Sequence, residues 1–274
     1  MAPQTKRGIE YDPAALDRAE RRFWREIWDS VPVEIAADHG IEQARFGEVQ
    51  ATVVRDLPTV GVMNLVLGAA QADEADLSYA LAWIAEQGVS PYVPVTPGLS
   101  GSAAAETQLR DKGFEPGYAW MKFLRDAHPP RFPAPDDVEV VELSVPDQEP
   151  FGTIAAIGFG LPAWGAEFFA HLPGREGWRC YVARVEGEPQ ACAAMLVEDG
   201  FAEFGIAATL EGARGRGCQT ALLHRRIRDA VEAGCQTLFV ETGERVPDRP
   251  SASYRNILRA GFEEAYLRPN WQRP

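Results

Sequence analysis

The stretch from Thr209 to Leu223 carries residue types that bind an anionic group. It reads T-L-E-G-A-R-G-R-G-C-Q-T-A-L-L, with glycines in a turn followed by an apolar helical pattern. Glycine lets the backbone approach a ligand closely, and the start of a helix offers unpaired N–H groups and a partial positive charge. Such a helix start suits a pyrophosphate. The guanidinium groups of Arg214 and Arg216 add donors that match phosphate geometry.

An isolated R-G-R-G pattern also occurs in ordinary solvent-exposed turns, so the surrounding elements decide between the two interpretations. Three strands are predicted before it, at residues 178–185, 189–197 and 201–209. Glu186-Gly187 and Asp199-Gly200 are the two-residue turns that would join them as hairpins. After the pattern come a helix at 217–233, a strand at 237–242, a helix at 251–260 and a strand at 262–267. A glycine loop between a strand and a helix favours an anion site.

The first half of the chain is predicted to be a separate domain. A helix begins at Asp12-Pro13, where proline suits the first helical position. Further helices are predicted at 76–87 and 103–112, and strands at 48–54, 61–69 and 91–96. The segment H-P-P-R-F-P-A-P, from His128 to Pro135, suits neither a helix nor a central strand. The predicted organisation is a domain at 1–126, a stiff linker at 127–137 and a domain at 138–274.

A short repeat links the two halves. The pattern G-F-E-x-x-Y occurs from Gly113 to Tyr118 and again from Gly261 to Tyr266, 148 residues later. Each copy follows a predicted helix that contains a Leu-Arg pair. Because both copies occupy the same place among the predicted elements, we expect two copies of one fold.

Composition narrows the function classes. The 274 residues are 46% apolar and 24% charged, which is typical of a globular protein. The net charge of −13 and the pI near 4.8 argue against nucleic-acid binding. No apolar run is long enough to span a membrane, and the first residues lack the apolar core of a secretion signal, so we expect a cytoplasmic protein. The four cysteines have no metal-ligand spacing, and we predict no metal site.

Arg214-x-x-Gly217-x-Gln219 resembles the signature Q/R-x-x-G-x-G/A of the GCN5-related N-acetyltransferase (GNAT) family. The resemblance covers residues 138–274. Together with the repeated pattern, it implies an α/β (α+β) fold: two tandem GNAT-like domains, each a mostly antiparallel twisted sheet flanked by helices. It also implies acetyl-CoA as the cofactor. The residues that would bind CoA are Arg214, Gly215, Arg216, Gly217, Cys218, Gln219 and Thr220 around its pyrophosphate, Ala207, Ala208 and Thr209 along its pantetheine, and Ser253 and Asn256 on the last helix.

The chain departs from the family pattern at three positions. Gln219 stands where the signature ends in glycine or alanine, and Glu211 stands where many members carry proline. Ile257 occupies the position of a tyrosine that protonates the leaving thiolate in many members. Tyr254, one turn earlier, is the nearest substitute, and it is equally interpreted as a packed aromatic residue. The first half has no such loop, because Gln71 to Asp76 contains neither glycine nor arginine, and its carboxylates would repel a pyrophosphate. We therefore expect a degenerate GNAT-like copy that has lost CoA binding and serves as structure or as one wall of the acceptor site.

Acetyl transfer to an amine needs a base for the ammonium proton and a polarised thioester carbonyl. Backbone N–H groups on the strand at 201–209 can polarise the carbonyl. Glu203 or Glu241 can act as the base, with His171 and His224 as alternatives. Exposed strand carboxylates are the alternative interpretation of both. The resemblance implies that the acceptor pocket includes the region of Trp164, Phe168, Phe169 and His171. Aromatic residues in such a segment also commonly form core.

Three functions stay open at this point. The first is acetyl-CoA-dependent N-acetylation of a small-molecule amine by direct transfer, with Cys218 serving no nucleophilic role. The second is a non-catalytic module that binds or senses acyl-CoA. The third is an acyltransferase that uses a longer acyl chain or an oxygen acceptor. The acceptor itself and the oligomeric state, monomer or homodimer, are not specified by the sequence.

Overall fold

Two compact units make up the protein, and each combines pieces from distant parts of the sequence. The computed structural model describes residues 4–6, 9–145, 149–247 and 251–274. The first unit contains residues 1–24, 32–121 and 266–274, and the second contains 25–31 and 122–265. The domain limits predicted from sequence follow the two halves of the chain, whereas the units share α1 (Pro13–Asp29), β7 (Glu115–Asp126) and β13 (Glu263–Gln272) between them.

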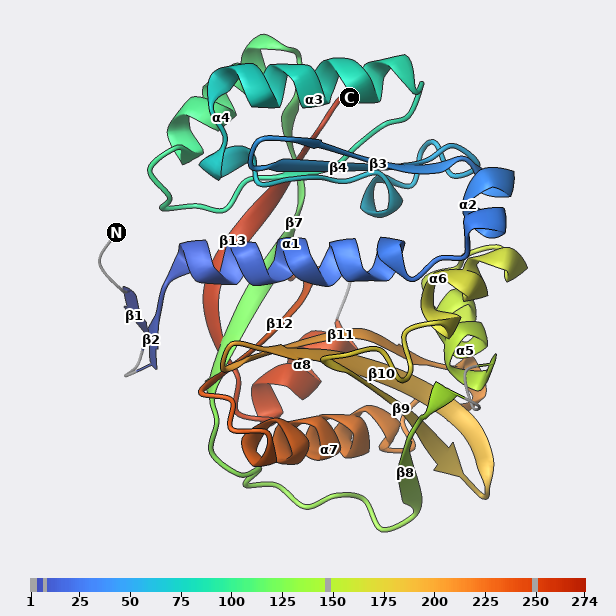
Figure 1. The fold of residues 1–274 in the computed structure, drawn as a ribbon. Coiled ribbons are helices and arrows are strands. Elements are labelled where there is room, and N and C mark those ends of the chain that lie inside the picture. Colours follow the sequence, from blue (N-terminus) through green and yellow to red (C-terminus); the bar gives the residue numbers. More distant parts are fainter. Residues whose placement is uncertain (1–3, 7–8, 146–148, 248–250) are drawn as a thin grey trace. The chain divides into compact units, whose positions relative to one another are not determined.

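The second unit is built on a mostly antiparallel sheet (Figure 1). Its strands are β8 (Val138–Glu142), β9 (Trp178–Val185), β10 (Glu188–Glu198), β11 (Phe201–Thr209) and β12 (Thr237–Gly243). They lie in the order β12-β11-β10-β9-β8, and β7 and β13 follow on the β12 side. Only the pairing of β11 with β12 is parallel among the registered pairs of this unit. The predicted strands at 178–185 and 201–209 match the observed ones residue for residue.

Two tight turns set the register of this sheet. Glu186 and Gly187 have φ values of 56° and 85°, and Asp199 and Gly200 have 47° and 81°. Positive φ at both central residues is the type I′ turn, whose twist matches that of the flanking strands. The two hairpins predicted from sequence are therefore present, and they place β9, β10 and β11 side by side.

Helices cover both faces of the sheet. α7 (Cys218–Glu232) lies along β8 to β11, and α5 (Glu149–Phe159) packs on the opposite face of β9 to β11 (Figure 1). The buried side of α7 includes Leu222, Leu223 and Ile227, at the spacing expected for one helical face. A single 3₁₀ turn (Ala163–Ala166) and the short α6 (Glu167–Ala170) follow α5, and α8 (Ala252–Arg259) contacts α7.

The proline-rich segment at 127–137 contains neither helix nor strand and is part of the second unit. The buried guanidinium of Arg125 donates to the carbonyls of Asp126, His128, Pro129 and Ala260. Farther along, Phe132 meets the ring of His224 on α7 edge-on, with 5.6 Å between centroids. The segment is thus held along α7 by side chains at several points.

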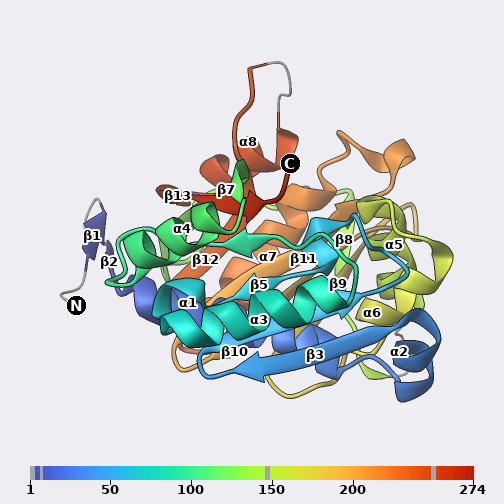
Figure 2. The same ribbon diagram turned by 90° about the horizontal axis from the view of Figure 1, so that it is seen from above.

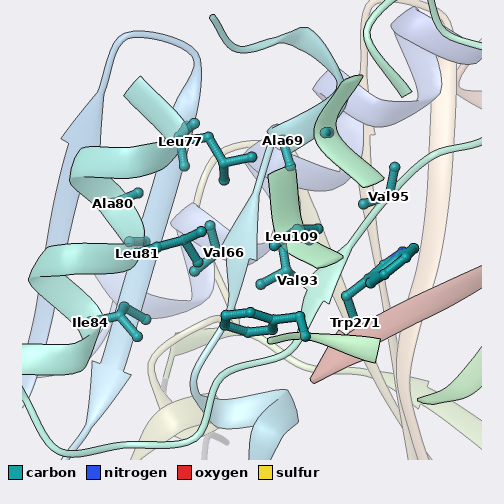
Figure 3. Packing of buried hydrophobic residues seen from close by; sticks show 14 of the residues in the cluster. Val66, Ala69, Leu77, Ala80, Leu81, Ile84, Val93, Val95, Leu109 and Trp271 are labelled. Carbon is teal, nitrogen blue, oxygen red and sulfur yellow. The ribbon is translucent and has the colours of Figure 1, made fainter. Parts of the chain in front are cut away.

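The first unit begins with β1 (Gln4–Lys6), β2 (Ile9–Tyr11) and α1. It continues with α2 (Val33–His39), β3 (Ile41–Phe46), β4 (Val49–Val54), β5 (Val66–Leu67), α3 (Glu74–Glu86), β6 (Val93–Pro94), α4 (Ser102–Asp111) and β7. α3 lies across the antiparallel β3-β4-β5 sheet (Figure 2). Apolar side chains from these helices and strands form its core with Trp271 of β13, including Val66, Leu81, Val93 and Leu109 (Figure 3).

The strand predicted at 61–69 is mostly a different structure. A 3₁₀ turn at Gly61–Met63 precedes β5, which contains only Val66 and Leu67. Buried Asn64 explains the difference, because its side-chain amide donates to the carbonyls of Leu57 and Val60 and its oxygen accepts from the N–H of Val54. An asparagine that bonds to nearby backbone in this way competes with a regular strand.

Both units have the same order of elements. Three antiparallel strands lead through a 3₁₀ turn into a helix, and a strand, a helix and a long strand follow in each. The repeated pattern marks equivalent places: Gly113 and Gly261 have φ values of 80° and 85°, and each ends a helix just before its long strand. Phe114 and Phe262, the next residues, are both buried. The common order is what a duplication of one fold predicts.

None of the helices in the part of the chain that the structure describes combines the length and apolar character needed to cross a membrane.

Candidate functional site

The loop between β11 and α7 is shaped by two glycines. After β11 ends at Thr209, a 3₁₀ turn at Glu211–Ala213 reverses the chain. Gly215 and Gly217 then adopt φ values of 82° and 83°. Residues that have a side chain rarely adopt this left-handed backbone conformation, so both positions favour glycine. Gly217 is also crowded, since a Cβ atom there would lie 2.9 Å from Cγ of Pro135.

The start of α7 has no side-chain cap. Gly217 occupies the N-cap position, and its carbonyl accepts the first helical bond, from the N–H of Ala221 at 3.0 Å. The next N–H groups, of Cys218, Gln219 and Thr220, have no intrahelical acceptor because they belong to the first turn. Backbone amides that converge without a capping side chain form a site for an anion.

Two arginines flank this helix start, and both are exposed. Nη2 of Arg216 donates to Oε1 of Glu186 at 2.7 Å. This hydrogen bond raises the pKa of Arg216 and lowers the pKa of Glu186. A solvent-exposed ion pair contributes little to stability, so Arg216 can exchange Glu186 for a phosphate at small cost. Arg214 follows the 3₁₀ turn, and its N–H donates to the carbonyl of Glu211 at 3.2 Å.

The side chain of Gln219 points back to the end of β11. Its Nε2 donates to the carbonyl of Ala208 at 3.1 Å and to Oγ1 of Thr209 at 2.9 Å. The glutamine that replaces the expected glycine or alanine therefore leaves the helix start open. These two hydrogen bonds also connect the first turn of α7 to β11, the strand that would pair with the pantetheine.

β11 and β12 separate beyond their fourth registered pair. They pair in parallel from Phe201 opposite Thr237 to Phe204 opposite Val240, yet they continue as strands to Thr209 and Gly243. The β12-facing edge of residues 205–209 therefore has no partner strand in the registered pairing of β11 with β12. An unpaired strand edge presents N–H and C=O groups to a ligand.

A bulge in β11 lies where the strands separate. Ala194 of β10 is opposite Gly205, but Cys192 is opposite Ala208, so β11 has one extra residue there. Ile206 adopts φ 48°, which is an outlier for a β-branched residue. Holding such a conformation costs about 1–3 kcal/mol and is most common at functional sites.

The bulge changes the face to which β11 side chains point. Phe204 packs towards α7, and its ring lies 5.7 Å from that of Phe262, which follows α8. Ala208 would share this face in a regular strand, because side chains alternate. Instead it meets α5, where a Cβ atom on Gly158 would lie 2.4 Å from Cβ of Ala208. Gly158, a helical glycine that the sequence analysis did not single out, allows α5 to approach the end of the splayed strand.

Glu203 and Glu241 occupy neighbouring strands of the same sheet. Glu203 is buried on β11 and is opposite Phe239 of β12. Glu241, two residues farther along β12, forms an ion pair with Lys122 of β7, with 2.8 Å between Oε2 and Nζ. Nζ of Lys122 also lies 5.9 Å from the ring centroid of Phe239. Lys122 was not expected from sequence; its only signal is a charged residue within the apolar M-K-F-L pattern of β7.

Tyr254 is buried on α8, and its hydroxyl donates to Oε1 of Glu264 at 2.5 Å. Its ring packs edge-on against Phe123, with 4.8 Å between centroids, and the guanidinium of Arg245 lies 4.2 Å from its ring centroid. Burial, together with the bond to Glu264, raises the pKa of Tyr254 to about 12. The hydroxyl is therefore protonated and hydrogen-bonded at neutral pH.

Other residues of α8 differ in their surroundings. Ser253 is exposed, and Asn256 accepts a hydrogen bond from Arg259 through Oδ1. Ile257 is buried at the position where the family resemblance places a tyrosine. Ser253 and Asn256 stay predictions as CoA contacts.

The expected acceptor-binding residues divide into core and surface. Phe168 and Phe169 are fully buried, and Phe168 packs edge-on against Trp28 and Trp164 at 5.3 and 5.2 Å. Trp164 is half-buried, and His171 pairs with Glu167 at 2.8 Å on the partly exposed side of α6. Phe168 and Phe169 are therefore core residues, whereas Trp164 and His171 keep some exposed surface. A role of these residues in binding the acceptor stays a prediction.

The four cysteines are buried and do not form disulfides. Burial raises the pKa of the Cys218 thiol, despite its place at the start of α7. A raised thiol pKa disfavours the thiolate that nucleophilic catalysis needs. This geometry agrees with the expectation that Cys218 is not a covalent acyl carrier.

The helix start of the first unit differs from that of α7. α3 has Asp73 at its N-cap, and Oδ1 of Asp73 accepts from the N–H of Asp76 at 2.8 Å. The first turn also contains Glu74 and Asp76. A capped and acidic helix start disfavours a pyrophosphate, so the start of α7 is the better candidate of the two for an anion site.

Comparisons with known proteins place the fold. No protein-family model matches the chain, and no curated protein is similar to it in sequence. Among solved structures, a GCN5-related N-acetyltransferase from Kribbella flavida is similar over 85% of this chain and 90% of its own, with a TM-score of 0.59 and 20% identity. The chain has the GNAT fold. A GCN5-related N-acetyltransferase from Sphaerobacter thermophilus is also similar, with a TM-score of 0.57, 15% identity, and coverage of 83% and 81%.

The likeness extends to a tandem arrangement of GNAT domains. A tandem GNAT protein from the clavulanic acid biosynthesis pathway covers 82% of this chain and 77% of its own, with a TM-score of 0.58 and 14% identity. Similarity at this level of identity concerns the fold. It confirms the tandem GNAT fold expected from Arg214-x-x-Gly217-x-Gln219 and from the repeated G-F-E-x-x-Y pattern.

Proposed function

We propose that this protein is an acyltransferase that uses acetyl-CoA to acetylate the amine of a small molecule. The observation that supports this most strongly is the uncapped start of α7 at the end of a splayed strand. The amides of Cys218, Gln219 and Thr220 would bind the CoA pyrophosphate, with Arg214 and Arg216 beside it. The unpaired edge at Ala207 to Thr209 would then pair with the pantetheine.

The same strand would polarise the thioester. An N–H on the β12-facing edge of residues 205–209 would donate to the carbonyl oxygen, where negative charge develops during transfer. The amine nitrogen then forms a bond to the carbonyl carbon, and the bond from this carbon to the CoA sulfur breaks. The reaction needs one proton removed from the amine and one delivered to the thiolate.

Glu203 is our candidate for the group that removes the amine proton, directly or through water. It is buried on β11, three residues before the bulge at Ile206. Glu241 is the weaker candidate because Lys122 already neutralises its charge at 2.8 Å. A carboxylate paired with a buried ammonium group has a lower affinity for the proton that a base must accept.

An acyl-CoA-binding module without turnover is the alternative that a specific observation favours. Ile257 replaces the expected thiolate donor, and the hydroxyl of Tyr254 is already bonded to Glu264. With neither residue available, protonation of the thiolate would depend on solvent. A module of this kind would bind CoA through the α7 start and release no thiol.

Thiol release separates these functions. The purified protein is mixed with acetyl-CoA and a panel of small amines, and free CoA thiol is followed with a chromogenic thiol reagent. We expect release that depends on both acetyl-CoA and at least one amine. Tight CoA binding without release on any amine would support the module instead. Repeating the assay with longer acyl-CoAs and with alcohols tests the third function, a longer acyl chain or an oxygen acceptor.

A further inference from the structure

Arg226 is a fully buried arginine in the middle of α7. Its Nη1 donates to the carbonyl of Ala194 at 3.1 Å, and its Nε donates to the carbonyl of Leu222 at 3.3 Å. Its guanidinium carbon lies 4.7 Å from the ring centroid of Phe204. Within the residues that the structure describes, no carboxylate forms an ion pair with it. Burial lowers the pKa of Arg226 to about 10, which leaves the group charged at neutral pH.

A charge in this place is costly. An apolar side chain of similar size would fill the space between α7 and the sheet without losing water of hydration. Buried Asp229 on the same helix forms ion pairs with Arg179 and Arg225. The remaining buried positions, such as Leu222, Leu223 and Ile227, are apolar. Packing alone therefore does not account for a guanidinium at this position.

The contacts of Arg226 converge on the bulge of β11. Ala194, whose carbonyl it binds, is opposite Gly205, and Phe204 is the residue before Gly205. On the other side of the bulge, the thiol of Cys192 donates weakly to the carbonyl of Ile206, with 3.7 Å between sulfur and oxygen. Arg226 thus contacts the β10 carbonyl opposite Gly205 and the ring of Phe204, and Cys192 contacts the carbonyl of Ile206 itself. Both side chains therefore lie at the bulge that contains the residue with φ 48°.

We propose that Arg226 is a positioning residue that holds Ile206 in its left-handed conformation and so aims the backbone N–H of the splayed β11 edge at the thioester carbonyl. The catalytic part of this proposal rests on the proposed acyltransferase function. The part that concerns the backbone of Ile206 does not, and it can be measured in the absence of turnover.

The first test compares Arg226→Met with the wild-type protein in kcat, KM for acetyl-CoA and affinity for CoA. Methionine fills much of the space without donating hydrogen bonds. We expect kcat to fall about 100-fold, the size of a lost donor to a developing oxyanion. The dissociation constant of CoA should stay within about threefold, because the α7 start is unchanged. An unchanged kcat would overturn the catalytic part.

Arg226→Lys is the second variant, and the same measurements are made on it if the methionine variant is insoluble. Lysine keeps the charge but cannot span two carbonyls with a planar group. We expect a loss of kcat of about tenfold, again without loss of CoA affinity. A purely structural role would instead lower stability and CoA affinity together, and a lysine variant with wild-type kcat would contradict the proposal.

A structural measurement separates this proposal from the proposed function. In a crystal structure of Arg226→Met, or of Arg226→Lys if only that variant is obtained, we expect Ile206 to leave the region of positive φ. An Ile206 that keeps φ near 48° would overturn the proposal even if turnover is observed. If the wild-type protein neither binds CoA nor releases thiol, the proposed function fails, while the conformation of Ile206 still decides whether Arg226 holds the bulge.

Discussion

The hydroxyl of Tyr254 lies 2.5 Å from Oε1 of Glu264, and this bond occupies the group that was the nearest substitute for the missing thiolate donor. The ring is buried between Phe123 and Arg245. A pKa of about 12 makes the hydroxyl a weak acid at neutral pH. This relationship supports a packing role for Tyr254 and leads to the first two predictions.

Tyr254→Phe should affect stability more than catalysis. The substitution removes one hydrogen bond and keeps the ring, so we expect the free energy of unfolding to fall by about 1 kcal/mol. We expect kcat to fall less than tenfold, measured as thiol release from acetyl-CoA. A 100-fold fall in kcat at unchanged melting temperature would show that the hydroxyl protonates the thiolate after all.

The same tyrosine should leave a signature at high pH. Its pKa is raised in the folded protein, to about 12, from an unfolded value near 10. The protonated form is therefore favoured by folding, and its contribution to stability is complete below about pH 10 and is lost as the pH rises towards 12. In urea unfolding at pH 9 to 12, the wild-type protein should lose more stability than Tyr254→Phe. Parallel curves for the two proteins would contradict the assignment.

Thr220→Glu should separate CoA binding from folding. Thr220 is the third residue of α7, where a carboxylate interacts favourably with the helix dipole by about 0.3–1 kcal/mol. The same charge would repel a pyrophosphate at the helix start, and we expect CoA affinity to fall at least about tenfold. Thr220→Gln, which has the same shape without the charge, is the control and should bind CoA nearly as well as the wild-type protein. Equal affinities for all three proteins would exclude this helix start as the pyrophosphate site.

Glu203→Gln should remove the proposed base while keeping the shape of the side chain. General base catalysis typically contributes about 10²–10⁴-fold, so kcat should fall within this range with little change in KM for acetyl-CoA. Glu241→Gln is the matched comparison on the neighbouring strand. Because it leaves the buried ammonium of Lys122 without its carboxylate, it should mainly lower stability. The reverse pattern would make Glu241 the base.

Much of the second unit could be predicted because its signals are local. Glu186-Gly187 and Asp199-Gly200 are residue pairs that favour two-residue hairpin turns, and both turns have the expected positive φ values. The glycines before α7 likewise indicate the loop between β11 and α7. The family signature identified the segment around Gly217, and the tandem GNAT fold is confirmed by solved structures. The CoA contacts themselves stay predictions.

Features that depend on distant contacts were not predictable. The unusual backbone of Ile206 lies at a bulge in the pairing with β10, and Arg226, which we propose holds it, is 20 residues away along the chain. Lys122 lies close to a proline-rich segment in the sequence, and only the sheet brings it to Glu241. Gln219 departs from the signature, and its bond to the carbonyl of Ala208 is visible only in three dimensions. The aromatic sequence around Phe168 and Phe169 is compatible with either a binding pocket or a hydrophobic core. In the structure both side chains are buried in the core.

The most direct test is calorimetric titration of the wild-type protein with CoA and, separately, with pantetheine, which lacks the pyrophosphate. If the amides at the start of α7 bind the pyrophosphate, CoA should bind at least about 100-fold more tightly than pantetheine, since hydrogen bonds to a charged group each contribute about 1.5–3 kcal/mol. No measurable binding of CoA, or equal affinities for CoA and pantetheine, would contradict the account.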